Sequence, residues 1–185
     1  SVVRLRTVGL KGDEVAEILI GVFDRCEVAL TAGAATSVRG HHARIHTLPL
    51  TSRLVATAND IPTWVLTLEG CDGARREAFE DAGVDVIDIP AGREGSIDLS
   101  QAMEALAESG VTRVLVEGGA HLAAALLRAD LVDRLIWFRA PRLMGGDGLP
   151  AAVAFGIDHL AQTPRFERVD IRPVGDDLME MYTRL

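Results

Sequence analysis

The feature that most constrains the fold of this chain is an alternation of short apolar runs and helical segments. Apolar runs predict buried strands over residues 63–68, 84–89 and 111–116. Helical segments over 74–82 and 98–109 separate them. Strand, helix, strand, helix, strand is typical of parallel βαβ units with right-handed crossovers. The pattern therefore predicts an α/β fold.

Single residues mark where these elements end. Gly83 and Gly110 stand where a helix C-terminal glycine belongs, and Pro90 stops the second strand. Asp98 is a good N-cap for the helix that carries Leu99, Ala102, Met103 and Leu106 on one face. The boundaries of both helices can therefore be predicted from local chemistry alone.

The junction after the third strand is the strongest candidate for a binding site. Glu117 follows the apolar run Val114–Val116, and Gly118-Gly119 lead into a helical run over 120–127. Paired glycines let a backbone approach a ligand closely, and the first N–H groups of a helix attract anions. The junction therefore predicts binding of a phosphate-bearing small molecule.

The remainder of the chain changes character. An apolar run predicts a strand over 135–140, followed by a glycine-rich loop over 141–148. Residues 166–174 and 178–183 flank Gly175-Asp176-Asp177, which is typical of a hairpin. With no linker or repeat, we expect one domain over residues 1–185.

Composition excludes several classes of function. The 185 residues are 48% apolar with 27 acidic and 19 basic side chains, a net charge of −8 and pI ≈ 5.1. This charge disfavours nucleic acid and anionic membranes as partners, and no apolar run is long enough to span a bilayer. Only Cys26 and Cys71 occur, which fits a reducing compartment. We therefore expect a cytoplasmic protein.

Three segments in this order resemble the reductase domain of bacterial riboflavin-biosynthesis proteins. They are residues 114–125, 131–135 and 140–146, with a further match in the Leu48–Leu54 segment. The resemblance covers residues 44–185 and implies a dihydrofolate-reductase-like mixed sheet. We expect that sheet to be mainly parallel, with helices on both faces and a C-terminal antiparallel hairpin. Cys26 and Cys71 do not supply the zinc site of the deaminase to which this domain is commonly fused.

The resemblance implies an NADPH-dependent oxidoreductase. Its reaction would be reduction of 5-amino-6-(5-phosphoribosylamino)uracil, in which ribose becomes a ribityl chain. Glu117 would bind the phosphorylated pyrimidine substrate, and Thr67 would contact the cofactor. The cofactor pyrophosphate would lie on the start of the helix, with contacts from Gly118, Gly119, Ala120, His121, Leu122 and Ala123. His121 facing solvent without a ligand remains an alternative.

The resemblance implies three further features. The Gly118–Gly119 peptide would be cis, as in dihydrofolate reductase relatives. One of Arg75, Arg76 and Arg93 would meet the NADPH 2′-phosphate, and the family's dimers imply a homodimer. The loop over 145–148 either lines the substrate or is a surface turn.

Residues 1–43 depart from the family pattern. They lack its Asp-Asp-Pro element, and Glu14–Phe23 has the apolar spacing of an amphipathic helix. Three explanations remain open. The segment has diverged toward another substrate, an unrelated start has been joined to a genuine C-terminal part, or the chain is a degenerate relative of the family. A non-catalytic NADP-binding or dimerisation module with an incomplete active site is therefore the alternative function. His41, His42 and His46 lack a metal-site pattern, so no metal is expected.

Overall fold

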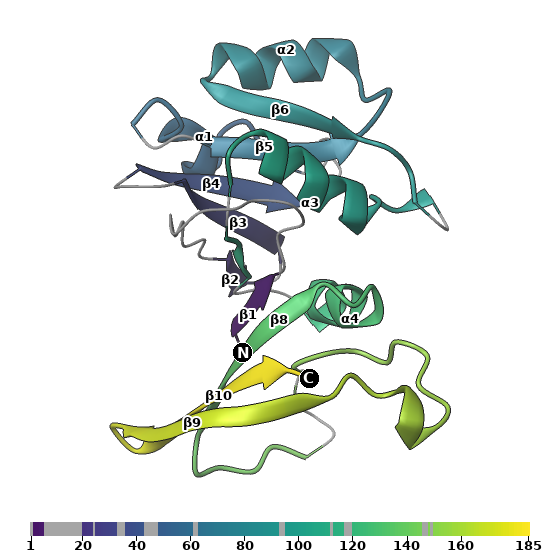
Figure 1. Ribbon diagram of the computed structural model, residues 1–185. Helices are drawn as coiled ribbons and strands as arrows, with labels where there is room; N and C mark the ends of the chain where they lie inside the picture. Colours follow the sequence, from purple (N-terminus) through teal and green to yellow (C-terminus); the bar gives the residue numbers. More distant parts are fainter. Residues whose placement is uncertain are drawn as a thin grey trace.

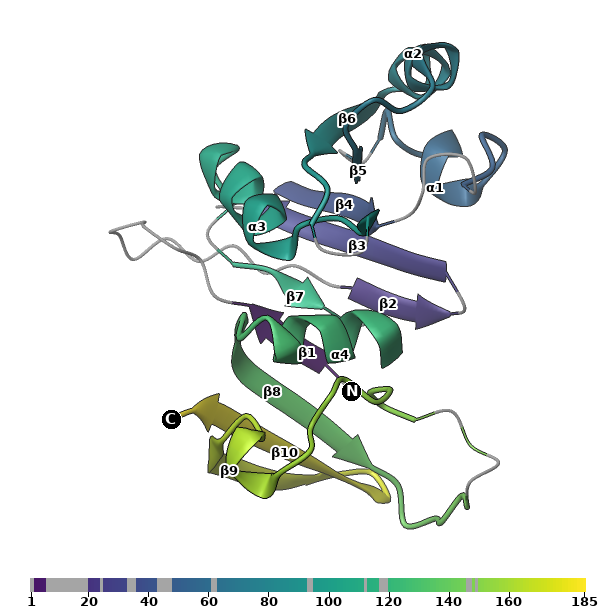
Figure 2. The same ribbon diagram turned by 90° about the vertical axis from the view of Figure 1, so that its right-hand side faces the viewer.

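The computed structural model describes residues 2–5, 20–23, 25–32, 36–42, 48–60, 63–92, 95–111, 113–116, 120–145, 148 and 150–185, with backbone alone before residue 48. The described strands form two five-stranded sheets, ordered β2-β3-β4-β5-β6 and β7-β1-β8-β10-β9 (Figure 1). The strands of the first sheet are β2 (Ile20–Phe23), β3 (Arg25–Ala32), β4 (Thr36–His42), β5 (Thr63–Leu68) and β6 (Val84–Ile89). Those of the second are β1 (Val2–Leu5), β7 (Leu115–Val116), β8 (Val132–Arg139), β9 (Phe166–Val174) and β10 (Asp177–Arg184). The sheets adjoin where β7 lies beside β2 and β3 (Figure 2).

The unit β5–α2–β6 forms as the sequence predicts. Helix α2 (Gly73–Asp81) starts at Asp72, whose carboxylate accepts a hydrogen bond of 2.9 Å from the backbone N–H of Arg75. It ends before Gly83, which has a φ of +84°. Strands β5 and β6 then pair in parallel from Thr63 opposite Val84 to Leu68 opposite Ile89. Apolar patterning and capping residues therefore fix this unit locally.

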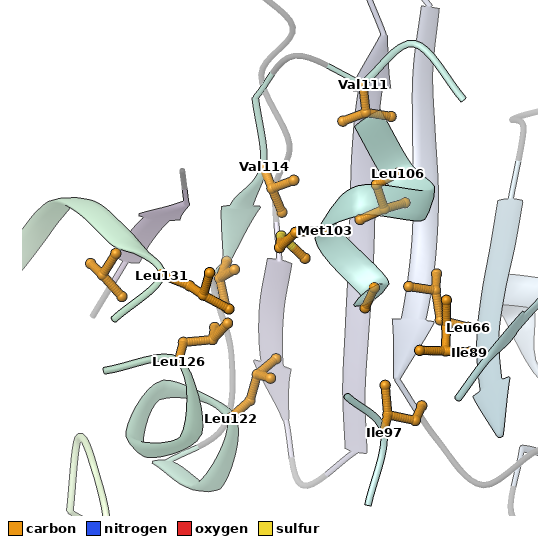
Figure 3. Packing of buried hydrophobic residues seen from close by; sticks show 13 residues of the cluster. Leu66, Ile89, Ile97, Met103, Leu106, Val111, Val114, Leu122, Leu126 and Leu131 are labelled. Carbon is orange, nitrogen blue, oxygen red and sulfur yellow. The ribbon is translucent and has the colours of Figure 1, made fainter. Parts of the chain in front are cut away.

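Helices cover both faces of the β5–β6 region. Neighbouring residues of a strand point to opposite faces, so Val65 and Leu66 belong to different buried clusters. Val65 packs with Phe79 of α2 and with the short helix α1 (Arg53–Ala56). Leu66 lies beside Ile89 in a second cluster, which also contains residues of α3 (Leu99–Glu108) and α4 (Ala120–Arg128) (Figure 3). The sheet is thus the middle layer between two hydrophobic cores.

Helix α3 begins and ends at the residues that the sequence singled out. The Asp98 carboxylate accepts hydrogen bonds from the N–H groups of Ser100 (2.9 Å) and Gln101 (3.1 Å). Ala102, Met103 and Leu106 are buried on its inner face, and Gly110 follows with a φ of +87°. After α3 the chain passes to β7, which pairs with β1 and not with β6. The predicted second βαβ unit therefore does not form a pair of adjacent strands.

Strands β8, β9 and β10 complete the second sheet. Strand β10 lies between the other two and pairs antiparallel with both. Helix α4 lies against β8, since Leu126 and Val132 share a buried cluster. The turn between β9 and β10 includes Gly175 at a φ of +61°, which confirms the predicted hairpin. A short helical turn, η2 (Leu160–Gln162), precedes β9.

The mixed α/β class, the hairpin and the helices on both faces are confirmed, while the balance of strand directions differs from the expectation. Two described strand pairs, β4–β5 and β5–β6, are parallel, and the other six are antiparallel. The reason is that residues 2–42 contribute four strands, which take part in four of the antiparallel pairs: β1–β7, β1–β8, β2–β3 and β3–β4. Residues 20–23 form β2, so the helix predicted over Glu14–Phe23 is wrong at that end.

Candidate functional site

The structure fixes both ends of the strand-to-helix junction. Val116 closes β7 with a side chain that is 1% exposed, and α4 begins at Ala120. Glu117, Gly118 and Gly119 lie outside the described residues, and so does the predicted cis peptide between the two glycines. The described residues on either side are therefore a buried strand end and a helix start, as the sequence predicts.

The first turn of α4 divides the predicted cofactor residues into two groups. Leu122 and Ala123 are buried at 8% and 7% exposure, and Leu122 packs in the same cluster as Ile97 (Figure 3). His121 is exposed and Ala120 is half-buried. A ligand at this helix start would therefore meet backbone N–H groups and the His121 side chain, whereas Leu122 and Ala123 would contribute backbone alone.

The segment after the glycine-rich loop returns to this helix start. The N–H of Val153 donates a hydrogen bond of 3.2 Å to the carbonyl of Ala120. In the loop itself, the N–H of Gly148 donates to the carbonyl of Gly145 at 3.1 Å. Leu143 and Met144 are exposed at 101% and 78%. The structure thus brings residues after 148 to the junction and leaves two apolar side chains of the loop in solvent.

Thr67 lies at the carboxyl end of β5 with 2% exposure, opposite Asp88 of β6. By the alternation of the strand its side chain shares a face with Val65, toward α1 and α2. Helix α4 packs on the other face, against the cluster of Leu66. The structure therefore does not bring the Thr67 side chain to the same face of the sheet as α4.

The two described arginine candidates for the 2′-phosphate are both engaged within the protein. The Arg76 guanidinium binds the carboxylates of Asp88 (2.5 Å) and Glu80 (2.8 Å) and the carbonyl of Val86 (2.9 Å). The hydrogen bond to Asp88 is the main cause that raises the pKa of Arg76. Arg76 therefore carries its charge throughout the physiological range.

Arg75 is held in a different way. Its guanidinium donates a hydrogen bond of 2.5 Å to the carbonyl of Leu48 and lies 5.4 Å from the centroid of the Phe79 ring. A phosphate at Arg75 or Arg76 would have to share these groups with existing partners. Arg93, the third candidate, lies outside the described residues.

Two further properties concern metals and membranes. Within the described side chains, no group of three or more His, Cys, Asp or Glu residues is arranged to hold a metal ion. His41 and His42 lie in β4, where the backbone alone is described, and His46 lies outside the described residues. None of the helices in the described ranges is long and apolar enough to cross a membrane.

Sequence reasoning missed two groups of charged residues. Glu180 is 6% exposed on β10. Its carboxylate forms ion pairs with Arg168 (3.4 Å) and Arg139 (3.5 Å) on the neighbouring strands. Arg128, Arg165 and Arg184 line one groove at the far end of α4. Both groups bring together residues that are far apart in the chain, so no local motif could have indicated them.

The fold and the junction define an α/β domain of the dihydrofolate-reductase-like class. Comparison with solved structures supports this: Acinetobacter baumannii RibD (form 2) matches with a TM-score of 0.65 at 24% identity, over 79% of this chain and 37% of that one. At this identity the likeness concerns the fold.

Sequence comparison gives the family. Residues 38–179 match the RibD C-terminal domain, so the chain belongs to that family. The riboflavin biosynthesis protein RibD of Bacillus amyloliquefaciens is 29% identical over 133 residues, which are 71% of this chain and 35% of the relative. The 2,5-diamino-6-ribosylamino-4(3H)-pyrimidinone 5′-phosphate reductase of Methanothermobacter thermautotrophicus is 34% identical over 88 residues, 47% of this chain and 41% of the relative. The match to the Bacillus protein thus spans about a third of that relative's length.

Proposed function

We propose that this chain is an NADPH-dependent pyrimidine reductase of riboflavin biosynthesis. The observation that carries the proposal is the family match over residues 38–179, which includes the whole junction from β7 into α4. A relative named as a reductase of a ribosylamino-pyrimidinone 5′-phosphate supports the substrate class. The substrate we propose is 5-amino-6-(5-phosphoribosylamino)uracil.

The residues of the junction would perform binding and orientation. The pyrophosphate of NADPH would meet the backbone N–H groups at the start of α4. When bound, the cofactor would supply its hydride to the first carbon of the ring-opened ribose, as imine or aldehyde, and water would supply the balancing proton. Glu117 would accept hydrogen bonds from the pyrimidine and so hold that carbon in line with the donor. Burial of Val116 and Leu122 would keep both ends of the junction in place.

The proposal is tested by fluorescence titration of the protein with NADPH, with NADH as the matched control. We expect saturable binding that prefers NADPH, because an arginine that binds the 2′-phosphate would distinguish the two cofactors. Reduction of the pyrimidine phosphate by the same preparation completes the test. Binding without turnover would favour a non-catalytic NADP-binding module, and absence of binding to either cofactor would contradict a cofactor site at the junction.

We further propose that the protein is a homodimer that associates through the outer part of the hairpin. Strand β9 is an edge strand, with open hydrogen-bonding groups that a second copy can pair. Exposed apolar side chains lie on both faces of the sheet beside this edge: Ile171 and Leu178 share a face with Glu180, and Phe138 and Val174 lie on the opposite face. An open strand edge flanked by exposed apolar side chains is typical of an interaction surface.

Light scattering at micromolar concentration tests this association. We expect a dimer for the unmodified chain and a monomer for Ile171→Asp, since a buried unpaired carboxylate is costly. Leu160→Asp is the control, because Leu160 is 87% exposed on η2, outside the hairpin strands. A monomeric unmodified protein, or dissociation by both variants alike, would contradict the proposed interface.

A further inference from the structure

A groove of ≈ 440 Å³ lies at the C-terminal end of α4, between that helix, the segment around η2 and the end of β10. Its lining includes Leu127, Arg128, Phe155, Ile157, Arg165 and Arg184. The groove meets α4 at Leu127, seven residues after Ala120, so about 10 Å of helix separates it from the junction. The groove is therefore distinct from the proposed cofactor site.

The charge of the groove is opposite to that of the chain. The chain carries a net charge of −8, yet three arginines line this groove together with Asp130. Arg184 is already neutralised, because it binds the Asp130 carboxylate and donates a hydrogen bond of 2.5 Å to the Asp130 carbonyl. The three guanidiniums therefore leave an excess of positive charge over the single carboxylate of Asp130 among the lining side chains.

Two of the arginines retain their hydrogen-bonding capacity. Arg128 and Arg165 are exposed, and neither guanidinium has an ion-pair partner among the residues that the structure describes. A guanidinium binds phosphate and carboxylate oxygens through two parallel N–H groups. Two such groups at one groove, in a chain with excess negative charge, favour an anionic ligand.

Hydrogen bonds within the protein hold the wall of the groove in place without a ligand. The Gln162 side-chain oxygen accepts hydrogen bonds from the N–H groups of Asp158 (3.0 Å) and His159 (2.9 Å). The Thr163 hydroxyl donates to the carbonyl of Leu160 at 2.7 Å, and the N–H of Leu185 donates to the carbonyl of Arg165 at 3.2 Å. These bonds hold the wall that carries Arg165. A preformed wall reduces the entropy lost on binding.

We propose that this groove binds a phosphate monoester that carries an aromatic or other apolar body. Arg128 and Arg165 bind the phosphate group. Leu127, Phe155 and Ile157 provide the apolar contact for the body of the ligand. The site is a second ligand site of the domain, independent of whether the junction holds a nicotinamide cofactor.

The test uses phenyl phosphate as the probe and amide NMR shifts of the full chain as the readout. We expect the shifts to concentrate at Gly156, Thr163 and Arg165, with weaker binding of inorganic phosphate and of phenol. The dissociation constant should rise at least tenfold in Arg128→Gln/Arg165→Gln. It should stay unchanged in Arg113→Gln/Arg134→Gln, which removes the same charge elsewhere. Affinity should also fall with added salt.

Three results would overturn the proposal. The first is equal affinity for phenyl phosphate and inorganic phosphate, which would mean that the apolar wall contributes nothing. The second is a shift pattern centred on residues 120–123, which would place the probe at the junction. The third is equal weakening in both double variants, which would show a response to total charge alone. Because the unmodified protein reports the location of the probe, the test does not depend on either variant folding.

Discussion

Replacing Glu117 by glutamine should lower kcat/KM for the pyrimidine phosphate by roughly 10- to 100-fold. The change keeps the shape of the side chain and removes the charge that, under the proposed function, would accept hydrogen bonds from the substrate. A hydrogen bond to a charged group contributes about 1.5–3 kcal/mol, and every 1.4 kcal/mol is about a factor of ten. NADPH affinity should stay within about twofold, since the pyrophosphate would bind backbone N–H groups of α4. The measurement is steady-state NADPH oxidation together with a cofactor titration.

The matched control for this variant is Glu108→Gln. Glu108 ends α3 and is exposed, so this change removes the same charge far from the junction. We expect its kcat/KM to equal that of the unmodified protein. Equal loss in both variants would indicate a general effect of charge. Full activity of Glu117→Gln would favour the alternative in which the carboxylate only caps the helix over residues 120–128 or pairs with an arginine.

Much of the fold between residues 63 and 128 could be predicted because its signals are local. Strands β5 and β6 have the predicted bounds, since each is a short apolar run closed by a loop or a proline. The N-cap carboxylates Asp72 and Asp98 and the left-handed Gly83 and Gly110 act on their own helices. Each of these effects depends on a few neighbouring residues. The local sequence is therefore sufficient to determine where these strands and helices begin and end.

The remaining parts depend on contacts between distant segments. Strand β2 occupies residues 20–23, although the apolar spacing there also fits a helix, because pairing with β3 stabilises the extended form. No short sequence pattern indicates that β7 pairs with β1 either. The extra antiparallel ladders arise from these long-range pairings.

The candidate site likewise has features that local sequence predicts and features that depend on tertiary contacts. The strand end at Val116 and the helix start at Ala120 follow from local pattern, and the structure agrees with both. The engagement of Arg76 with Asp88 and Glu80 depends on the packing of α2 beside β6. The sequence alone made Arg76 a candidate phosphate ligand. An arginine near a strand end can bind a phosphate, and the sequence does not reveal which carboxylates of the protein bind it instead. Tertiary contacts therefore decide which charged groups are available.

Replacing Phe79 by alanine should destabilise the protein by about 3–5 kcal/mol. Phe79 is 0% exposed and joins α2 to α1 and to β5 in one buried cluster. Its removal leaves a cavity and also takes away the ring beneath Arg75. Since a domain is stable by about 5–15 kcal/mol in total, this one change should remove a large fraction. The denaturant midpoint should fall while the slope m stays constant.

This variant also tests whether residues 1–185 fold as one domain. Phe79 lies on one face of the first sheet, whereas Trp64 packs against the cluster on the other face. If both cores belong to one cooperative unit, tryptophan fluorescence and far-ultraviolet circular dichroism should shift together in Phe79→Ala on a Trp137→Phe background, in which the fluorescence reports Trp64. Phe138→Ala, at 44% exposure, should cost less than about 1 kcal/mol when measured below the concentration of dimer formation. Separate transitions for the two probes would mean that α4, and the junction before it, fold independently of α2.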